Sequence, residues 1–92
     1  MDFQKQRELY VEAAKEHLHN YGTKNYSDHI VDIIVSVMFT RDGIMQGGSF
    51  VQAIVNNDLR GAISRADADC INHLRVIALA YGNAFVEQLN YN

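Results

Sequence analysis

Four histidines and a single cysteine, Cys70, are the side chains of this sequence with the greatest potential for chemistry. Cys70 and His73 stand three residues apart, a spacing that puts both on one face of a helix and could supply two zinc ligands. A zinc site needs further ligands, and the sequence designates none. His17 and His19 are two residues apart, so they point to different sides of a helix. We therefore expect surface histidines, a core thiol, no metal ion and no cofactor.

The same cysteine could act as a nucleophile, with His73 as its base. Cys70 falls, however, on the same apolar stripe as Ile63 and Leu74. A thiol in such surroundings behaves as a small inert side chain. The sequence therefore predicts no catalytic cysteine.

Ser49 is the other candidate nucleophile, because it follows two glycines. The segment lacks the strand and second glycine of a nucleophile elbow, and it lacks the lysine of a phosphate-binding loop. We expect Ser49 to cap a helix instead. No catalytic residues are predicted, and we expect no enzymatic activity unless folding brings His29, Asp69 and His73 together.

Composition and charge favour one small globular domain, residues 1–92. Hydrophobic residues make up 48% of the chain and charged residues 21%, and proline is absent. The net charge of −3 argues against a broad phosphate-neutralising face. With one cysteine, no long apolar run and a polar start, the sequence predicts a protein of a reducing cytoplasm that does not enter a membrane.

Hydrophobic periodicity predicts helices for the elements that must position these residues. Residues 2–21 form an amphipathic helix that Asp2 can cap. Residues 28–41 are apolar nearly all round, and the β-branched stretch 30–39 is also compatible with a buried strand. Helix is favoured there, because the length suits about four turns and Asp42 and Gly43 follow as a stop signal.

Shorter helices are predicted in the second half, after a hinge or tight turn at Gly47 and Gly48. We expect helices over 49–56 and 58–66, then either an unbroken continuation or, preferably, a fifth helix that Asp67 caps and that ends between Tyr81 and Leu89. The fold class is all-α, a compact bundle of four to five helices. Its predicted core is Ile30, Ile33, Ile34, Val37, Phe50, Ile54, Leu59, Ile63, Leu74 and Ile77.

Residues 28–41 carry more apolar surface than a small bundle readily covers. Their apolar side chains face all directions, namely Ile30, Val31, Ile33, Ile34, Val35, Met38 and Phe39. The sequence therefore predicts a homodimer that buries this excess.

Exposed arginines and aromatic residues are the candidates for binding a partner, because these types are enriched in interface hot spots. The predicted binding residues are Phe50, Arg60, Arg65, Arg75 and Tyr81. Alternatively, Arg60 and Arg65 only pair with Asp58, Asp67 or Asp69. A basic target would instead select the acidic face of the first helix, which carries Glu8, Glu12 and Glu16.

The segment from Asn56 to Arg65 also has the spacing of a helix-turn-helix. Its second helix would have to present base-reading groups from its N-terminal half. That half offers only Arg60, and Asp58 stands at its start. Direct DNA binding is therefore the alternative rather than the main prediction.

Three short motifs resemble the central segment of small proteins encoded by bacteriophages, prophages and plasmids. The motifs are Gly48-Ser49-Phe50, Asn57-Asp58-Leu59 and Arg65-Ala66-Asp67. Members of that kind often have a proline before Gly-Ser-Phe, and the Gly47 found here predicts a looser turn.

This resemblance implies a viral or mobile-element accessory protein, and small acidic proteins of this kind include anti-CRISPR and other anti-defence inhibitors. The expected function is therefore binding and inhibition of a host protein or protein complex in the bacterial cytoplasm. The alternative is a helix-turn-helix regulator of phage genes. If neither holds, a structural role in the virion is the next hypothesis.

Overall fold

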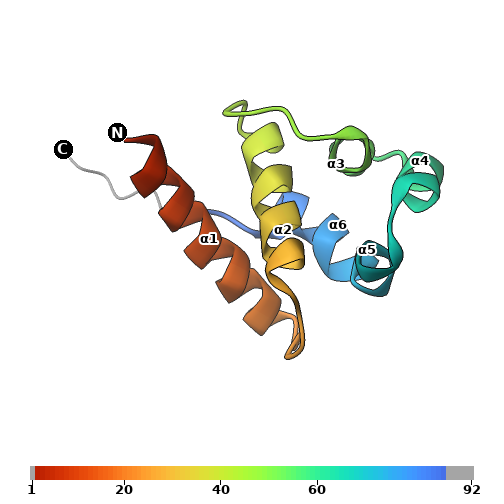
Figure 1. Ribbon diagram of the computed structural model, residues 1–92, viewed down its shortest axis with the longest axis horizontal. Helices are drawn as coiled ribbons and strands as arrows, with labels where there is room; N and C mark the ends of the chain where they lie inside the picture. Colours follow the sequence, from red (N-terminus) through yellow and green to blue (C-terminus); the bar gives the residue numbers. More distant parts are fainter. Residues whose placement is uncertain (1, 87–92) are drawn as a thin grey trace.

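The computed structural model describes residues 2–86, and within them the chain is all-helical (Figure 1). The described part has six helices and no strand: α1 Phe3–Asn20, α2 Asp28–Arg41, α3 Ser49–Val55, α4 Leu59–Arg65, α5 Ala68–Asn72 and α6 Leu74–Asn83. The all-α prediction is confirmed, and residues 30–39 are helix rather than strand. The predicted count of four to five is close but too low.

Helix α2 is the centre of the molecule. It packs against α1, α3 and α6, so that a different helix covers each side (Figure 1). Ile30, Ile34, Val37 and Met38 are fully buried. Only a narrow, mostly polar face of α2 is exposed to solvent. Packing by three helices therefore buries the apolar side chains of a helix that is apolar nearly all round.

The apolar excess that led us to expect a homodimer lies inside a single chain. Val31, Val35 and Phe39 are each no more than 4% exposed, and Met38 is fully buried. The surface on which the dimer prediction rested is therefore covered by α1, α3 and α6. We do not carry the homodimer into the proposal below.

Gly47 lies in the loop before α3, outside any assigned turn, and two hydrogen bonds hold it there. Its N–H donates to Thr40 Oγ1 over 2.8 Å, and its carbonyl accepts from Gln52 Nε2 over 2.8 Å. A Cβ at this position would lie 2.6 Å from both Ser36 Oγ and Val51 Cγ1. A proline could neither donate the first bond nor fit this space.

His73 divides the predicted fifth helix into α5 and α6. Its Nδ1 lies 2.9 Å from the carbonyl oxygen of Asp69, and its Nε2 lies 3.1 Å from that of Asn25. In a continuous helix the carbonyl of Asp69 would accept from the backbone N–H of His73. Here it bonds to the ring of His73, and the backbone N–H donates to the carbonyl of Cys70 instead. The helix that Asp67 caps ends at Asn72, and α6 ends at Asn83; Leu89 lies outside the described residues.

Both ring nitrogens of His73 face carbonyl oxygens, which only accept hydrogen bonds. The ring therefore satisfies both contacts as the doubly protonated cation. The bond to Asp69 is the main cause of a raised pKa for His73, and the bond to Asn25 acts in the same direction. His73 thus links the loop before α2 to α5.

Most of the predicted core is confirmed, but two of its members are not in it. Among the ten residues, Ile30, Ile34, Val37, Phe50 and Ile77 are buried, and Ile33, Ile54 and Leu74 pack partly buried against them. Leu59 and Ile63, in contrast, are 63% and 48% exposed.

Helix α4 packs inward through its smallest residues. Gly61 and Ala62 are buried, whereas Leu59 and Ile63 lie about 60° and 100° further round the helix from Ala62. The apolar stripe of α4 is therefore buried only at one edge, and its two large side chains face solvent.

We expect Ile34→Ala and Leu59→Ala to differ sharply in their effect on stability. The first leaves a cavity beside a fully buried side chain and should lower the free energy of unfolding by about 2–5 kcal/mol. The second removes an exposed side chain and should change it by no more than about 0.5 kcal/mol. Urea denaturation followed by circular dichroism measures both. If Leu59→Ala lowered the free energy of unfolding as much as Ile34→Ala does, the exposed position of Leu59 on α4 would be wrong.

His17 is a core residue, contrary to the surface position expected for the histidines. It is only 3% exposed, and its Nε2 donates to the carbonyl of Val76 over 2.8 Å, joining α1 to α6. Burial lowers the pKa of His17, although the bond to Val76 acts against this shift. The neutral ring is therefore the form that the fold accommodates.

The stabilisation that His17 provides should be lost on acidification. Because its pKa is lowered in the folded state, the unfolded chain binds the proton first, and stability falls as the pH drops below the usual value of about 6.5. His17→Gln keeps an N–H donor and removes the titration. The difference in unfolding free energy between wild type and His17→Gln should shrink from about pH 8 to about pH 5.5. A constant difference would contradict the buried neutral histidine.

Candidate functional site

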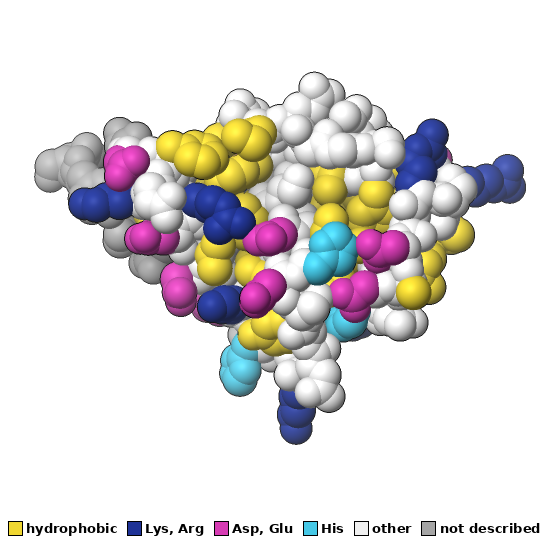
Figure 2. Space-filling view, in the orientation of Figure 1, with side chains coloured by type: hydrophobic (Ala, Val, Ile, Leu, Met, Phe, Trp, Pro, Cys, Tyr) yellow, Lys and Arg dark blue, Asp and Glu magenta, His cyan; other side chains and the backbone are white. Residues whose placement is uncertain are grey.

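One end of the molecule presents four exposed residues of α4: Leu59 and Ile63 share one face, Arg60 borders that face, and Arg65 lies on the side opposite Ile63. We refer to these four residues as the α4 surface. Figure 2 shows basic side chains over α4 with apolar side chains beside them at the same edge of the molecule. The turn before α4 places Asn57 in the left-handed region, at φ 57°, and the Asp58 carboxylate caps the helix by accepting from the N–H of Gly61 over 3.0 Å.

The two arginines of the α4 surface do not pair with the acidic residues near them in sequence. Within residues 2–86, no ion pair involves Arg60 or Arg65. The Arg65 guanidinium donates to the carbonyl of Gly61, one turn back on its own helix. The alternative in which these arginines are held by Asp58, Asp67 or Asp69 is not what the described residues show.

The other predicted binding residues lie elsewhere. The Arg75 guanidinium stacks over the ring of Tyr21, 5.5 Å from its centroid, and Tyr81 is 44% exposed on α6. Phe50 is only 8% exposed and belongs to the core, so its ring offers a partner almost no surface. The structure thus gathers Arg60 and Arg65 on α4, and puts Arg75 and Tyr81 on α6. The glutamates of α1 (Glu8, Glu12 and Glu16) are exposed.

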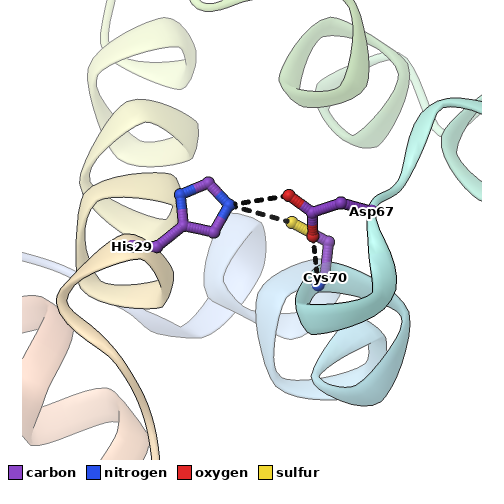
Figure 3. Close-up of side chains that lie close together, drawn as sticks. All are labelled: His29, Asp67 and Cys70. Carbon is purple, nitrogen blue, oxygen red and sulfur yellow. Dashed lines mark hydrogen bonds and ion pairs between the residues drawn. The ribbon is translucent and has the colours of Figure 1, made fainter.

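A second group of reactive side chains forms where the start of α2 meets α5. His29 Nε2 lies 2.9 Å from Asp67 Oδ2 and 3.9 Å from Cys70 Sγ, and all three atoms lie within 4.8 Å of one another (Figure 3). We call these three residues the His29 cluster. His29 and Asp67 are exposed, and Cys70 is buried behind them.

Helix capping positions the His29 cluster. Asp67 caps α5, and its Oδ1 accepts from the N–H of Cys70 over 2.8 Å, which leaves Oδ2 turned toward His29 (Figure 3). Ser27 caps α2 and also donates to Asp69 Oδ2 over 2.7 Å. The N-terminal ends of α2 and α5 are therefore bonded to each other, and His29 follows in the first turn of α2.

The His29 cluster does not have the geometry of a cysteine–histidine nucleophile. In such a site the thiol meets one ring nitrogen and the carboxylate holds the other. Here Asp67 and Cys70 both face Nε2. Burial raises the pKa of the Cys70 thiol to about 11, with further contributions from the Asp67 and Asp69 carboxylates. The shift is large, but its direction keeps the thiol protonated, whereas a nucleophile needs the thiolate.

The sequence did not reveal this cluster. It paired Cys70 with His73, because they are three residues apart, and the tertiary structure instead directs His73 to Asp69 and Asn25 and gives Cys70 the partner His29. Asp67 was correctly identified as a helix cap. The capping signal at Asp67 was visible in the sequence, but nothing in it says that the capped end of α5 meets the start of α2.

The raised pKa of Cys70 predicts slow thiol chemistry. A pKa of about 11 in place of 9.0 lowers the thiolate fraction about 100-fold at about pH 8. In the presence of a chelator, a disulfide reagent should therefore react with the native chain at least about 100-fold more slowly than with the chain in urea. The rate of release of the chromophore measures this, and Cys70→Ser gives the blank. Equal native and unfolded rates would contradict a buried, protonated thiol.

No protein-family model, curated protein or solved structure matches this chain. Among the helices that the structure describes, none is both long and apolar enough to span a membrane.

Proposed function

We propose that the chain is a protein-binding module whose α4 surface docks into an apolar groove rimmed by carboxylates on a partner protein. One observation carries the proposal: Leu59 and Ile63 are 63% and 48% exposed on a capped helix that also presents Arg60 and Arg65. Arginine is enriched in interface hot spots, and neither arginine of α4 is in an ion pair in the described chain. Exposed aliphatic side chains gain free energy when a partner buries them.

The energetics favour such docking. Full burial of an exposed leucine or isoleucine contributes about 1.5–3 kcal/mol. Leu59 and Ile63 would gain a large part of this free energy when a partner buries their exposed surface. The α4 backbone is held by Asp58 and packed through Ala62, which is 1% exposed, so little ordering is needed on binding. Arg60 and Arg65 outnumber the one carboxylate of this segment, Asp58, and the excess positive charge would attract an acidic partner.

The segment around residues 48–67 resembles phage and plasmid proteins, and this resemblance supports a host protein as the partner. That segment includes α3 and α4, and therefore the whole α4 surface. We propose that the chain is a mobile-element protein, acting in the host cytoplasm, that occupies a functional surface of a host protein, such as a component of a defence complex. Inhibition by occupancy requires no reaction chemistry, so the proposal is of a binder and not of an enzyme.

The alternative function is DNA binding by the segment Asn56–Arg65. Helices α3 and α4 follow each other with the short turn of a helix-turn-helix. The first exposed side chain of α4 is the apolar Leu59, however, and the Asp58 carboxylate stands at the helix start, where a phosphate or base edge would lie. These features favour a protein partner.

The double variant Leu59→Ser/Ile63→Ser tests the proposal. Both side chains are exposed, so the fold should be retained, while the affinity for the partner should fall about 10-fold or more. The partner is first captured on the wild-type chain from nuclease-treated host lysate, then purified, and its Kd is measured for each variant. Met45→Ser is the matched control, because Met45 is 54% exposed but lies outside α4.

Charge reversal gives an independent measurement on the same surface. Arg60→Glu/Arg65→Glu should slow association with the purified partner and weaken or invert its dependence on salt. A partner whose Kd is unchanged in both double variants would overturn the α4 surface as the binding site. Retention on DNA that salt and nuclease abolish, without a protein partner, would establish the DNA-reading alternative.

A further inference from the structure

We propose that His29, Asp67 and Cys70 form a binding site for Zn²⁺, with Nε2, Oδ2 and Sγ as ligands and water in the fourth position. The three atoms come from α2, from the residue that caps α5 and from α5 itself, and they converge on one point (Figure 3). A set of imidazole, thiolate and carboxylate selects zinc over the hard cations magnesium and calcium, which prefer oxygen alone. The site is independent of the α4 surface and of the proposed function.

The separations of the ligand atoms are close to those that zinc requires. Bond lengths of about 2.0–2.3 Å in a tetrahedron put neighbouring ligand atoms about 3.3–3.6 Å apart. The observed distances are 2.9 Å from His29 Nε2 to Asp67 Oδ2 and 3.9 Å from the same nitrogen to Cys70 Sγ, with no pair beyond 4.8 Å. His29 and Asp67 are exposed on the outer side, so small rotations of their side chains can complete the site.

Protons hold the cluster together when no ion is bound, and the ion would replace them. Asp67 Oδ2 can accept from the ring N–H of His29, and the thiol proton of Cys70 also lies next to this carboxylate. On binding, the Cys70 S–H bond breaks, its proton goes to solvent and the thiolate electron pair binds zinc. Neutral His29 gives its Nε2 lone pair and carries its proton on Nδ1. Zinc, one thiolate and one carboxylate sum to zero charge.

The surroundings orient the ligands and favour a cation. Asp67 Oδ1 stays on the N–H of Cys70, so a backbone hydrogen bond fixes the carboxylate that would bind the metal. A second carboxylate, Asp69, stands two residues on and is held by Ser27. In Figure 2, histidine and acidic side chains gather over the middle of the face shown, and the basic side chains over α4 lie toward its edge.

A bound ion would act as a cross-link between α2 and α5. Helix α5 packs on α6, and Ser27 and His29 at the start of α2 form hydrogen bonds with Asp69 and Asp67 at the start of α5. Zinc would replace a solvent-exposed hydrogen bond between His29 and Asp67, which contributes little to stability, with three coordinate bonds. The expected consequence is a higher unfolding temperature in the presence of zinc.

Binding of Zn²⁺ and Co²⁺ to the full chain, stripped of metal with a chelator, tests the site. Calorimetry should show one zinc ion per chain, with a Kd in the micromolar range or below and proton release that depends on the buffer. Cobalt should give the near-ultraviolet charge-transfer band of a thiolate ligand. Asp67→Asn is the sharpest variant, because asparagine preserves the helix cap while the charged ligand is lost.

Each ligand variant should lower the zinc affinity about 10-fold or more, and Cys70→Ser should also abolish the cobalt charge-transfer band. His29→Gln should bind weakly, whereas His19→Gln, which removes an exposed histidine outside the cluster, should bind as the wild type does. Circular dichroism confirms that each variant is folded. The proposal is overturned if the wild type binds no zinc, if His29→Gln and Asp67→Asn bind it unchanged, or if the cobalt complex lacks the thiolate band.

Discussion

Burial of α2 is the constraint on which the rest of this fold depends. Seven of its side chains are buried, on all but one narrow side of the helix, and each buried side needs a neighbour. Helices α1, α3 and α6 are these neighbours, and the loops between the helices must return the chain to α2 each time. The short helices α4 and α5 are joined to this core through α3 and α6, which is why they can present residues at the surface.

The polar stripe of α2 carries the bonds that fix its neighbours. His29 contacts Asp67 at the start of α5, Asp32 pairs with Arg7 of α1, and Thr40 accepts from the N–H of Gly47 before α3. Exposed pairs of this kind contribute little free energy individually. Their value here is geometric, because each selects one placement of a neighbouring element. The His29 cluster is the one such contact that also brings together three metal-ligating atoms.

Two helix ends close the bundle at its other side. Arg41, at the end of α2, donates to the carbonyls of Tyr81 and Ala84 at the end of α6 and to the adjacent Asp42. Tyr10 of α1 donates to the same Asp42 over 2.7 Å, and burial with this bond raises the pKa of Tyr10 to about 12. An arginine beside the last carbonyls of a helix satisfies acceptors that have no partner within it. The middle of α1 is thus bonded to the end of α2, which is bonded in turn to the end of α6.

Local signals determined which residues form helices and where most of them begin. Caps at Asp2, Ser27, Asp58 and Asp67 act within three residues, and the three- and four-residue spacing of apolar side chains is likewise a local property. The all-α class, the central role of residues 28–41 and half of the core list were therefore within reach of the sequence.

Tertiary packing decided which edge of an apolar stripe is buried and which distant residues meet. Leu59 and Ile63 are exposed because α3 approaches α4 over Gly61 and Ala62, and only the docked helices fix that direction. The ring of His73, where α5 ends, is hydrogen-bonded to the carbonyl of Asn25, which is far away in sequence. The His29 cluster joins residues 38 and 41 positions apart. Such contacts depend on how helices are placed against one another, and no spacing along one helix encodes that placement.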